Sequence, residues 1–300
     1  MRLLVPPLVA LCLIYFAASI ATGSRARRDF AVLVALSSVL HPWFLPRDLP
    51  LLRGCAALVA FVGTMRVIDL RRGEWTLRDR MLHIASVVDT RRLVKATPTF
   101  HGRGVAVGLA WLVVAFAGFG GLEAMSSASA GPFWLARWGA TLLVVYGGVS
   151  AGYALIEVAY AALGFTTPSL HNAPLSSRTV QELWGERWAK PVSLWLGETF
   201  FRPFARRRRP ATGALAAFTV SAGFHAYGVW VALGVVTGLP MTAWMFAFFV
   251  AQALVMAVER RLGVKKWAPW AGHLWTVTLM LATAPMFLEP TARILGMEPR

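Results

Sequence analysis

An ionisable side chain interrupts a long apolar run in the last third of the chain. His225 lies within the run 215–239, which follows the aromatic and charged segment 182–188 and the basic residues Arg202 and 206–209. An ionisable ring at bilayer depth is costly, and such residues usually serve a function. Burial favours the neutral imidazole, the form that accepts a proton in general-base catalysis. The pattern therefore predicts that His225 has a functional role, for which a general base is one candidate.

Two further interpretations of this run stay open. The ring of His225 can instead form a hydrogen bond between helices, as histidines in membranes often do. Ser221 lies one helical turn before His225, where it can support the ring or bond back to its own helix. Glu157, in the apolar run 135–163, is a second intramembrane polar group that can orient a site imidazole or simply pack.

The composition is that of an integral membrane protein. Of the 300 residues, 57% are hydrophobic and 15% are charged, whereas soluble domains carry about 45–50% and about 25%. The net charge of +16 arises from basic residues between apolar runs, so we expect no nucleic-acid partner. Cys12 and Cys55 lack metal-ligand spacing. We expect both to be small buried hydrophobes, and we expect no metal site.

Hydropathy predicts an all-α polytopic transmembrane protein with about eight spans, within a range of seven to ten. We expect one membrane-embedded domain over residues 1–300. The apolar run 3–21 exceeds the core of a cleaved signal, so it is expected to be the first span. The candidate spans are 3–22, 30–45, 50–65, 104–124, 135–163, 212–238, 241–258 and 268–288.

Lysine and arginine divide unevenly between the loops. The segments 23–29, 66–103, 164–211 and 259–267 hold 24 of the 30 basic residues, and the termini and alternate loops hold the rest. The positive-inside rule then places the long loops 66–103 and 164–211 in the cytoplasm, in a multi-pass protein of the cytoplasmic membrane. Apolar and basic residues interleave in 66–103, which favours an amphipathic segment on the anionic leaflet; a solvated linker is the alternative.

The loop 164–211 contains the predicted functional segment. Residues 176–182 resemble a helix start, with Ser or Thr followed three or four positions later by Gln or Glu. Trp184 and Trp188 are one helical turn apart, as are Leu183 and Arg187. Indole rings prefer the membrane interface, so a segment that merely anchors the loop is the simpler interpretation.

These patterns together resemble the wax synthase-like branch of the membrane-bound O-acyltransferases. The resemblance covers about 176 to 230, roughly a quarter of the chain, and the combination of motif and histidine is more specific than either alone. The residues that carry it are Ser177, Leu183, Trp184, Gly185, Arg187, Trp188, Phe218, Ser221 and His225.

The resemblance implies transfer of a fatty acyl group from acyl-coenzyme A to a hydroxyl group of a lipophilic acceptor, with His225 as the catalytic residue and Ser221 as its support. It implies no cofactor besides the co-substrate acyl-coenzyme A. Two positions depart from the family pattern: Ala189 replaces an Asn or His, and Ala226 replaces a carboxylate after the histidine. These departures put the second polar partner and the orientation of the imidazole in doubt.

The same segment offers candidates for substrate binding. Coenzyme A is polyanionic, and guanidinium groups bind phosphates in a bidentate manner. Alternatively, these cations set the membrane topology and attract anionic lipids. The candidates for the substrate entrance are Trp184, Arg187, Trp188, Lys190, Arg202 and Glu157.

Two rival functions remain open. In a transporter or lipid-binding protein, His225 and Glu157 would form a polar relay, although the chain lacks the internal repeats common in transporters. The second rival is a catalytically inactive relative, suggested by Ala189 and Ala226. Detection of acyl transfer that depends on His225 would distinguish the enzyme from the transporter and from the inactive relative.

Overall fold

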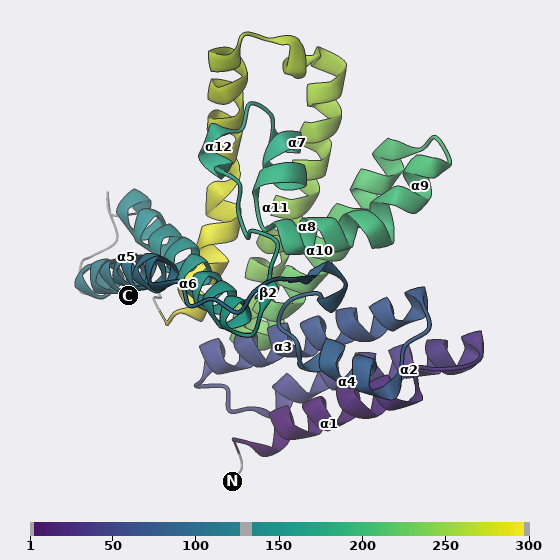
Figure 1. The fold of residues 1–300 in the computed structure, drawn as a ribbon. Helices are drawn as coiled ribbons and strands as arrows, with labels where there is room; N and C mark the ends of the chain where they lie inside the picture. The colour runs from purple at the N-terminus through teal and green to yellow at the C-terminus, as the bar shows by residue number, and fades with distance from the viewer. Residues whose placement is uncertain (1–2, 127–133, 297–300) are drawn as a thin grey trace. The chain divides into compact units, whose positions relative to one another are not determined.

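The computed structural model describes residues 3–126 and 134–296, and most of them are helical (Figure 1). Within this part of the chain only two short strands occur. Strand β1 (Val94–Lys95) pairs antiparallel with β2 (Phe165–Thr166), with Val94 opposite Thr166. The prediction of an all-α polytopic membrane protein is confirmed. Part of the connection between the predicted spans 104–124 and 135–163, and both chain ends, lie outside the described residues.

Six helices in the described chain are long and apolar enough to cross a membrane. Each contains a window of high mean hydropathy and few charges, as a bilayer about 30 Å thick requires. The six are α3 (Pro50–Asp69, continued by the 3-10 turn η2, Leu70–Arg72), α5 (Gly102–Ser126), α6 (Trp134–Ala162), α10 (Pro210–Leu233), α11 (Val235–Leu262) and α12 (Pro269–Ile294).

The first two of the eight predicted spans are helical but shorter. Helix α1 (Val5–Ile20) has 16 residues, and α2 (Arg25–Ser37) has 13. The chain leaves α2 as the 3-10 helix η1 (Ser38–Phe44), which contains Pro42. Proline lacks the amide hydrogen that an α-helix would use. The structure therefore provides six full-length candidates where the sequence predicts about eight.

The described helices group into two compact units. Unit 1 comprises the chain up to Leu93 together with Tyr227–Leu239 and Ile294–Gly296, and unit 2 comprises Val94–Ala226 and Pro240–Arg293. The sequence predicts one domain over 1–300. Helices α10 and α11 have residues in both units, as does α12 through its last residue, Ile294.

Small residues let the helices of unit 1 approach closely. Gly63 of α3 faces Ile14 of α1 so tightly that an added Cβ would overlap the isoleucine side chain. Glycine and alanine at such crossings are typical of membrane helices, where van der Waals packing drives association. The buried core of the unit consists of Ile14, Ala17, Ala18, Ala21, Ala31, Ala35, Val67 and Leu70.

Helix α4 (Leu77–Ala85) forms in the long loop for which an amphipathic segment is predicted. Thr76 caps it by accepting the backbone amide of Asp79 at 3.1 Å. Its buried residues are Arg80 and His83, whereas Leu82 is 53% exposed. The apolar side chains on its exposed surface suit contact with lipid, and a 3-10 turn, η3 (Thr90–Arg92), follows.

Both cysteines are free and exposed, so the prediction that they are buried was wrong. Cys12 belongs to α1 and Cys55 to α3, two helices that are apolar on nearly every side. In such helices the exposed face can be as apolar as the buried face. Apolar neighbours in sequence therefore do not tell a lipid-facing position from a core position.

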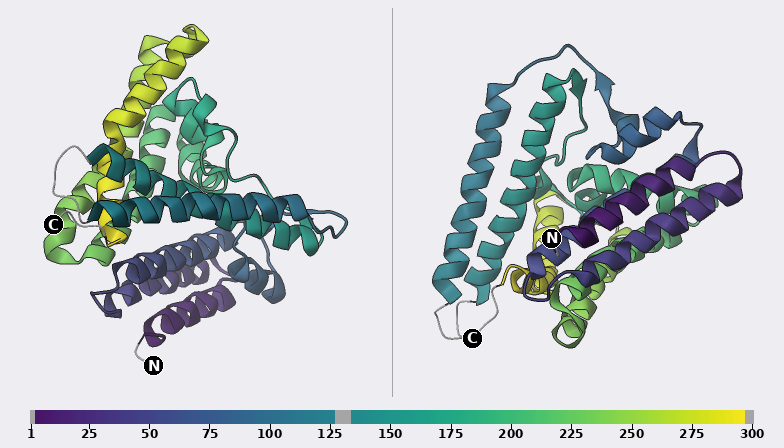
Figure 2. Two further views of the ribbon diagram at one scale, coloured as in Figure 1. Left: turned by 90° about the vertical axis from the view of Figure 1, so that its left-hand side faces the viewer. Right: turned by 90° about the horizontal axis from the view of Figure 1, so that it is seen from below.

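Unit 2 contains a long antiparallel pair, α5 and α6, which lie side by side in both views of Figure 2. Gly118 and Gly147 make the contact close: a Cβ at Gly118 would lie 2.7 Å from the carbonyl oxygen of Ala140, and one at Gly147 would lie 2.8 Å from the amide of Ala115. Only glycine fits at this spacing, as in other tightly packed membrane helices.

The loop 164–211 and the connection after α11 consist of short helical turns. In the loop, two π-helical turns alternate with short α-helices, a pattern often found at functional sites. These elements are η4 (Pro174–Ser176), α7 (Val180–Glu182), η5 (Leu183–Arg187), α8 (Lys190–Leu196), η6 (Gly197–Phe201), α9 (Arg202–Arg206) and, after α11, η7 (Val264–Lys266).

Candidate functional site

The predicted helix start at 176–182 is present, with Thr179 as its cap. The Thr179 hydroxyl accepts a hydrogen bond from the backbone amide of Glu182 at 2.9 Å. The Glu182 carboxylate accepts one from the backbone amide of Arg178 at 2.8 Å. These two hydrogen bonds pair backbone N–H groups that have no partner within the first turn of a helix. The turn α7 then widens into the π-helical turn η5, so Trp184 and Trp188 do not lie on a regular α-helix.

A buried carboxylate on α11 anchors the beginning of this segment. Glu259 is 3% exposed, and its oxygens accept the backbone amides of Val180 at 2.7 Å and Gln181 at 3.1 Å. The indole of Trp275 on α12 donates to the same carboxylate at 3.1 Å. A buried carboxylate is tolerated only when such donors surround it. The segment is therefore fixed to α11 and α12, between which α7 lies in Figure 1.

Helix α12 makes two further contacts with the segment. A Cβ at Gly272 would lie 2.7 Å from the carbonyl oxygen of Arg178, so this approach requires glycine. The neighbouring His273 has its Nδ1 3.1 Å from the carbonyl oxygen of Ser177. Because a carbonyl only accepts, Nδ1 donates here.

Trp184 is embedded in an aromatic cluster. Its ring centroid lies 6.0 Å from Phe249, 6.1 Å from Phe248 and 6.2 Å from Phe218. Its indole nitrogen donates to the side-chain oxygen of Gln252 at 3.3 Å. The phenylalanine rings pack against the apolar part of the indole, and the glutamine accepts the hydrogen bond that its N–H group needs when buried. The intramembrane Gln252 thus positions a motif residue.

His225 lies against the same aromatic cluster. Its ring centroid is 4.3 Å from that of Phe249 and 6.3 Å from that of Phe287. Nδ1 lies 2.8 Å from the carbonyl oxygen of Ser221, so Nδ1 carries the hydrogen and donates it. The neutral ring then has its free electron pair on Nε2. His225 is an exposed residue in this structure.

Ser221 orients the imidazole through its backbone rather than through its hydroxyl. The bond to His225 uses the Ser221 carbonyl oxygen, which any residue type would supply at this position. Ala226, where the resembled family has a carboxylate, is 5% exposed and packed in the unit. The Ser221 carbonyl is therefore the group that orients the ring.

Arg187 holds the segment together internally. Its guanidinium contacts the Glu182 carboxylate at 2.6 Å, and it donates to the carbonyl oxygens of Asn172 at 3.1 Å and Ala173 at 3.4 Å. Burial alone would raise the pKa of Glu182, but the Arg178 amide and the Arg187 guanidinium bring that pKa below its ordinary value. Arg187 has the contacts of a residue that shapes the site.

The other predicted substrate-binding residues are not gathered at His225. Lys190 Nζ lies 3.5 Å from the Ser169 hydroxyl, and Arg202 lies 3.7 Å from Glu198. Glu157 of α6 is half-buried. Among the residues that the structure describes, these three side chains make no hydrogen bond, ion pair or ring contact with His225 or Trp184. Their roles in binding stay predictions.

A histidine to which the sequence assigns no role joins the motif. The ring of His171 stacks on Tyr146 with 5.3 Å between centroids and lies 4.6 Å from Trp188. Its Nδ1 accepts the backbone amide of Ala189 at 3.2 Å. Burial lowers the pKa of His171, which favours the neutral ring that accepts this bond. No spacing in the sequence links positions 171 and 189, so only the fold reveals the contact.

Ala189 has a left-handed backbone conformation, with φ 40° and ψ 49°. Its Cβ makes this conformation unfavourable by about 1–2 kcal/mol, whereas glycine adopts it readily. We expect Ala189→Gly to stabilise the protein by about 0.5–1 kcal/mol, because relief of strain outweighs the added freedom of the unfolded chain. Thermal unfolding in detergent measures the change. Ala205→Gly in α9 is the control, since its helical position predicts destabilisation; a lower unfolding temperature for Ala189→Gly would contradict the prediction.

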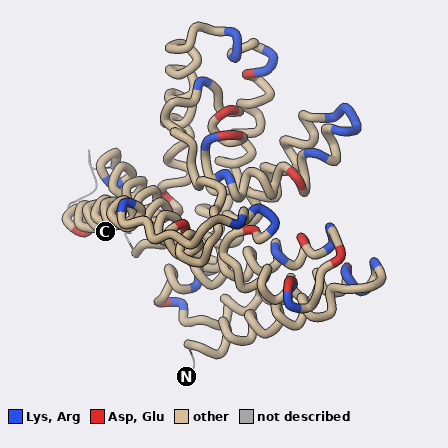
Figure 3. The backbone as a smooth tube through the Cα atoms, in the orientation of Figure 1, with Lys and Arg blue, Asp and Glu red and all other residues tan. Residues whose placement is uncertain are grey.

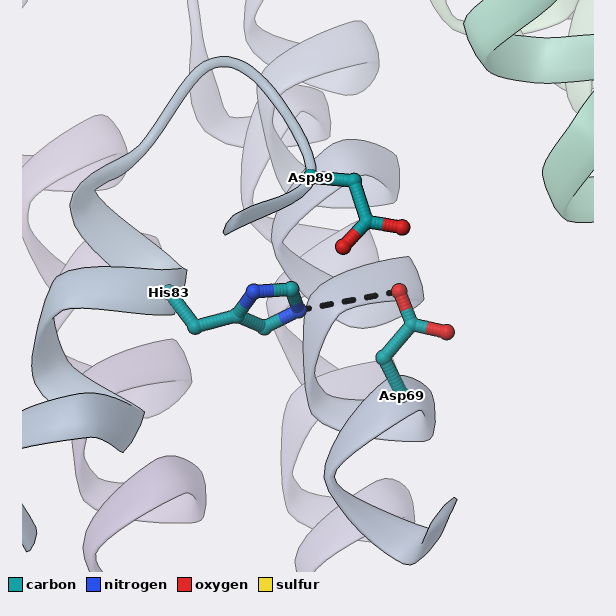
Figure 4. Close-up of side chains that lie close together, drawn as sticks. All are labelled: Asp69, His83 and Asp89. Carbon is teal, nitrogen blue, oxygen red and sulfur yellow. Dashed lines mark ion pairs between the residues drawn. The ribbon is translucent and has the colours of Figure 1, made fainter. Parts of the chain in front are cut away.

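Unit 1 holds a separate buried charge cluster, shown in Figure 4. Asp69 and His83 are fully buried and Asp89 is 6% exposed. Nε2 of His83 points at Asp69 over 3.6 Å, and its Nδ1 lies 2.7 Å from the Thr90 hydroxyl. One ligand atom from each of the three acid and imidazole groups lies within 4.8 Å of the others, which is the spacing of a metal site.

Arginines already neutralise both carboxylates of this cluster. Asp69 lies 3.1 Å from Arg91 and 3.2 Å from Arg72, and Asp89 lies 2.6 Å from Arg91. Desolvation would raise the pKa of Asp89, but its bonds to Arg91 lower it to about 2. A divalent cation would have to displace guanidinium groups that do not lose their charge. The arrangement is therefore that of a structural ion cluster.

The chain matches no protein-family model and no curated protein.

Proposed function

We propose that this protein is a membrane O-acyltransferase that moves a fatty acyl group from acyl-coenzyme A to a hydroxyl group of a lipophilic acceptor. The main support is the state of one imidazole: His225 is exposed, its Nδ1 is committed to a carbonyl, and its Nε2 is ready to accept a proton. The motif resemblance supplies the reaction class. The shared contact of His225 and Trp184 with Phe249 links both halves of that motif.

In the proposed reaction, Nε2 of His225 takes the proton of the acceptor hydroxyl as its oxygen attacks the thioester carbonyl. The carbon–sulfur bond then breaks, and the imidazolium returns the proton to the coenzyme A thiolate. The products are an ester and free coenzyme A, and the ring ends neutral. General-base catalysis of this kind accelerates reactions by about 10²–10⁴-fold. The reaction needs no metal or cofactor.

The basic loop 164–211 is the proposed entrance for coenzyme A. Lys190, Arg202 and the exposed arginine run 206–209 offer cations for its phosphates. The positive-inside rule favours a cytoplasmic position for this loop, in the cytoplasmic membrane, where acyl-coenzyme A is available. The acyl chain then enters from the apolar side of the bundle.

The test is an ester-forming assay with the purified full-length protein in lipid nanodiscs. Radiolabelled palmitoyl-coenzyme A is supplied with a panel of acceptors: a fatty alcohol, a diacylglycerol and a sterol. We expect a labelled ester and an equal amount of free thiol that both depend on acceptor and protein. Uptake of substrate into proteoliposomes without ester would support the transporter, and neither activity would support the inactive relative.

A further inference from the structure

Three arginines of unit 1 surround a hollow at the beginning of helix α2. The hollow has a volume of about 290 Å³ and is lined by Gly23, Arg25, Arg28 and Arg71. Figure 3 shows Lys and Arg in this stretch of the chain, drawn in blue. The beginning of a helix carries a partial positive charge and open amides, which adds to the attraction for anions. Charge and shape both suit an oxyanion.

The acidic residues near the hollow do not use all of its donors. Arg71 and Arg25 pair with Asp29, and Arg28 lies 2.5 Å from Glu74. Three guanidinium groups face only two carboxylates, so positive charge and N–H donors remain for a further oxyanion in the hollow.

An apolar groove lies on the helix that leads to this hollow. Its volume is about 430 Å³, and it runs along α1 with helical spacing of three and four residues. The helix ends at Ile20, close in sequence to Gly23. The groove spans eleven residue steps, or about 16 Å at 1.5 Å per residue, a length suited to much of an acyl chain. Its lining residues are Val5, Leu8, Val9, Cys12, Leu13 and Phe16.

We infer that unit 1 binds a phospholipid, with its phosphate in the hollow of Arg25, Arg28 and Arg71 and an acyl chain in the groove of α1. Positive charge next to an exposed apolar groove matches a ligand with an anionic head and an apolar tail. A soluble phosphate compound would use only the hollow. This inference is independent of the proposed acyl transfer.

The test is native mass spectrometry of the full-length protein in detergent, titrated with dioleoylphosphatidylglycerol. We expect Arg28→Gln/Arg71→Gln to weaken binding about tenfold or more, since each basic residue near a membrane surface contributes about fivefold. Arg78→Gln, an exposed arginine of α4, is the matched control and should leave binding unchanged. Dioleoylglycerol, which lacks the phosphate, should bind the wild-type protein as weakly as the double variant binds the phospholipid.

A second variant tests the groove without touching the ion pairs. Cys12→Trp fills the groove and should weaken phospholipid binding several-fold, whereas Cys12→Ser should not. If inorganic phosphate competes fully with the lipid and Cys12→Trp has no effect, the hollow is a site for soluble phosphate and the inference fails. Equal losses in Arg78→Gln and in the double variant would show general charge attraction and would also overturn it. If the glutamine double variant does not fold, Arg28→Lys/Arg71→Lys replaces it in the test. This variant keeps both positive charges and should retain part of the affinity for the phospholipid.

Discussion

His225→Ala should lower the rate of ester formation by about 10²–10⁴-fold, which is the contribution of a general base. The alanine side chain removes Nε2, and no other imidazole contacts the His225 position among the described residues. Without the base, the acceptor hydroxyl attacks the thioester while still protonated. Binding of acyl-coenzyme A should change little, because the loss concerns the chemical step.

Three variants make this result interpretable. His225→Gln keeps a side-chain amide but has no nitrogen that accepts a proton, so it should be as inactive as alanine. Ser221→Ala should retain nearly full activity, because the Ser221 contact with the ring uses the backbone carbonyl. His101→Ala, at an exposed loop histidine, should be active. If His225→Ala folds, as judged by thermal unfolding, and still transfers acyl groups at the wild-type rate, His225 is not the base.

Long elements were predictable because apolar length alone specifies a membrane helix. The predicted span 135–163 matches α6 (Trp134–Ala162), and the predicted span 268–288 overlaps α12 (Pro269–Ile294) in all but its first residue. The helix start before Trp184 was predictable for another reason: capping depends on residues three positions apart. Local rules of this kind need no knowledge of the fold.

Burial within the spans was not predictable from the same pattern. Arg53 lies near the beginning of the predicted span 50–65, and no pattern indicates that it is only 1% exposed, with its guanidinium 5.2 Å from the Trp43 ring. Cys12, in contrast, was expected in the core and is exposed. When a helix is apolar all round, its periodicity does not show which face meets a neighbouring helix.

The surroundings of the candidate site were also beyond the sequence. Glu259 and Gln252 are far from the motif along the chain, yet they bind Val180 and Trp184. His171 approaches Ala189 from a loop with no periodic pattern. Contacts of this kind depend on how α11 and α12 pack against the loop. A motif identifies the residues of a site, whereas the packing decides which partners orient them.

Asp69→Asn should be the most destabilising change in unit 1, at about 3–5 kcal/mol, as expected when one partner of a buried charge network is removed. The asparagine keeps the shape but removes the negative charge that faces Arg72, Arg91 and His83. Those arginines remain charged, because a guanidinium does not lose its proton in a protein. The substitution therefore destabilises the folded state and not the unfolded state, because water hydrates all of these groups in the unfolded chain.

Denaturant unfolding of the purified protein in detergent measures this loss as a lower midpoint. Asp48→Asn is the control, because Asp48 is an exposed carboxylate and its neutralisation should change the free energy of unfolding by less than about 0.5 kcal/mol. A chelator separates the ion cluster from a metal site. If EDTA lowers the wild-type midpoint as much as the substitution does, Asp69, His83 and Asp89 hold a metal ion and the arginines must move aside. An unchanged midpoint in EDTA with a large loss in Asp69→Asn means that the arginines alone balance the buried carboxylates.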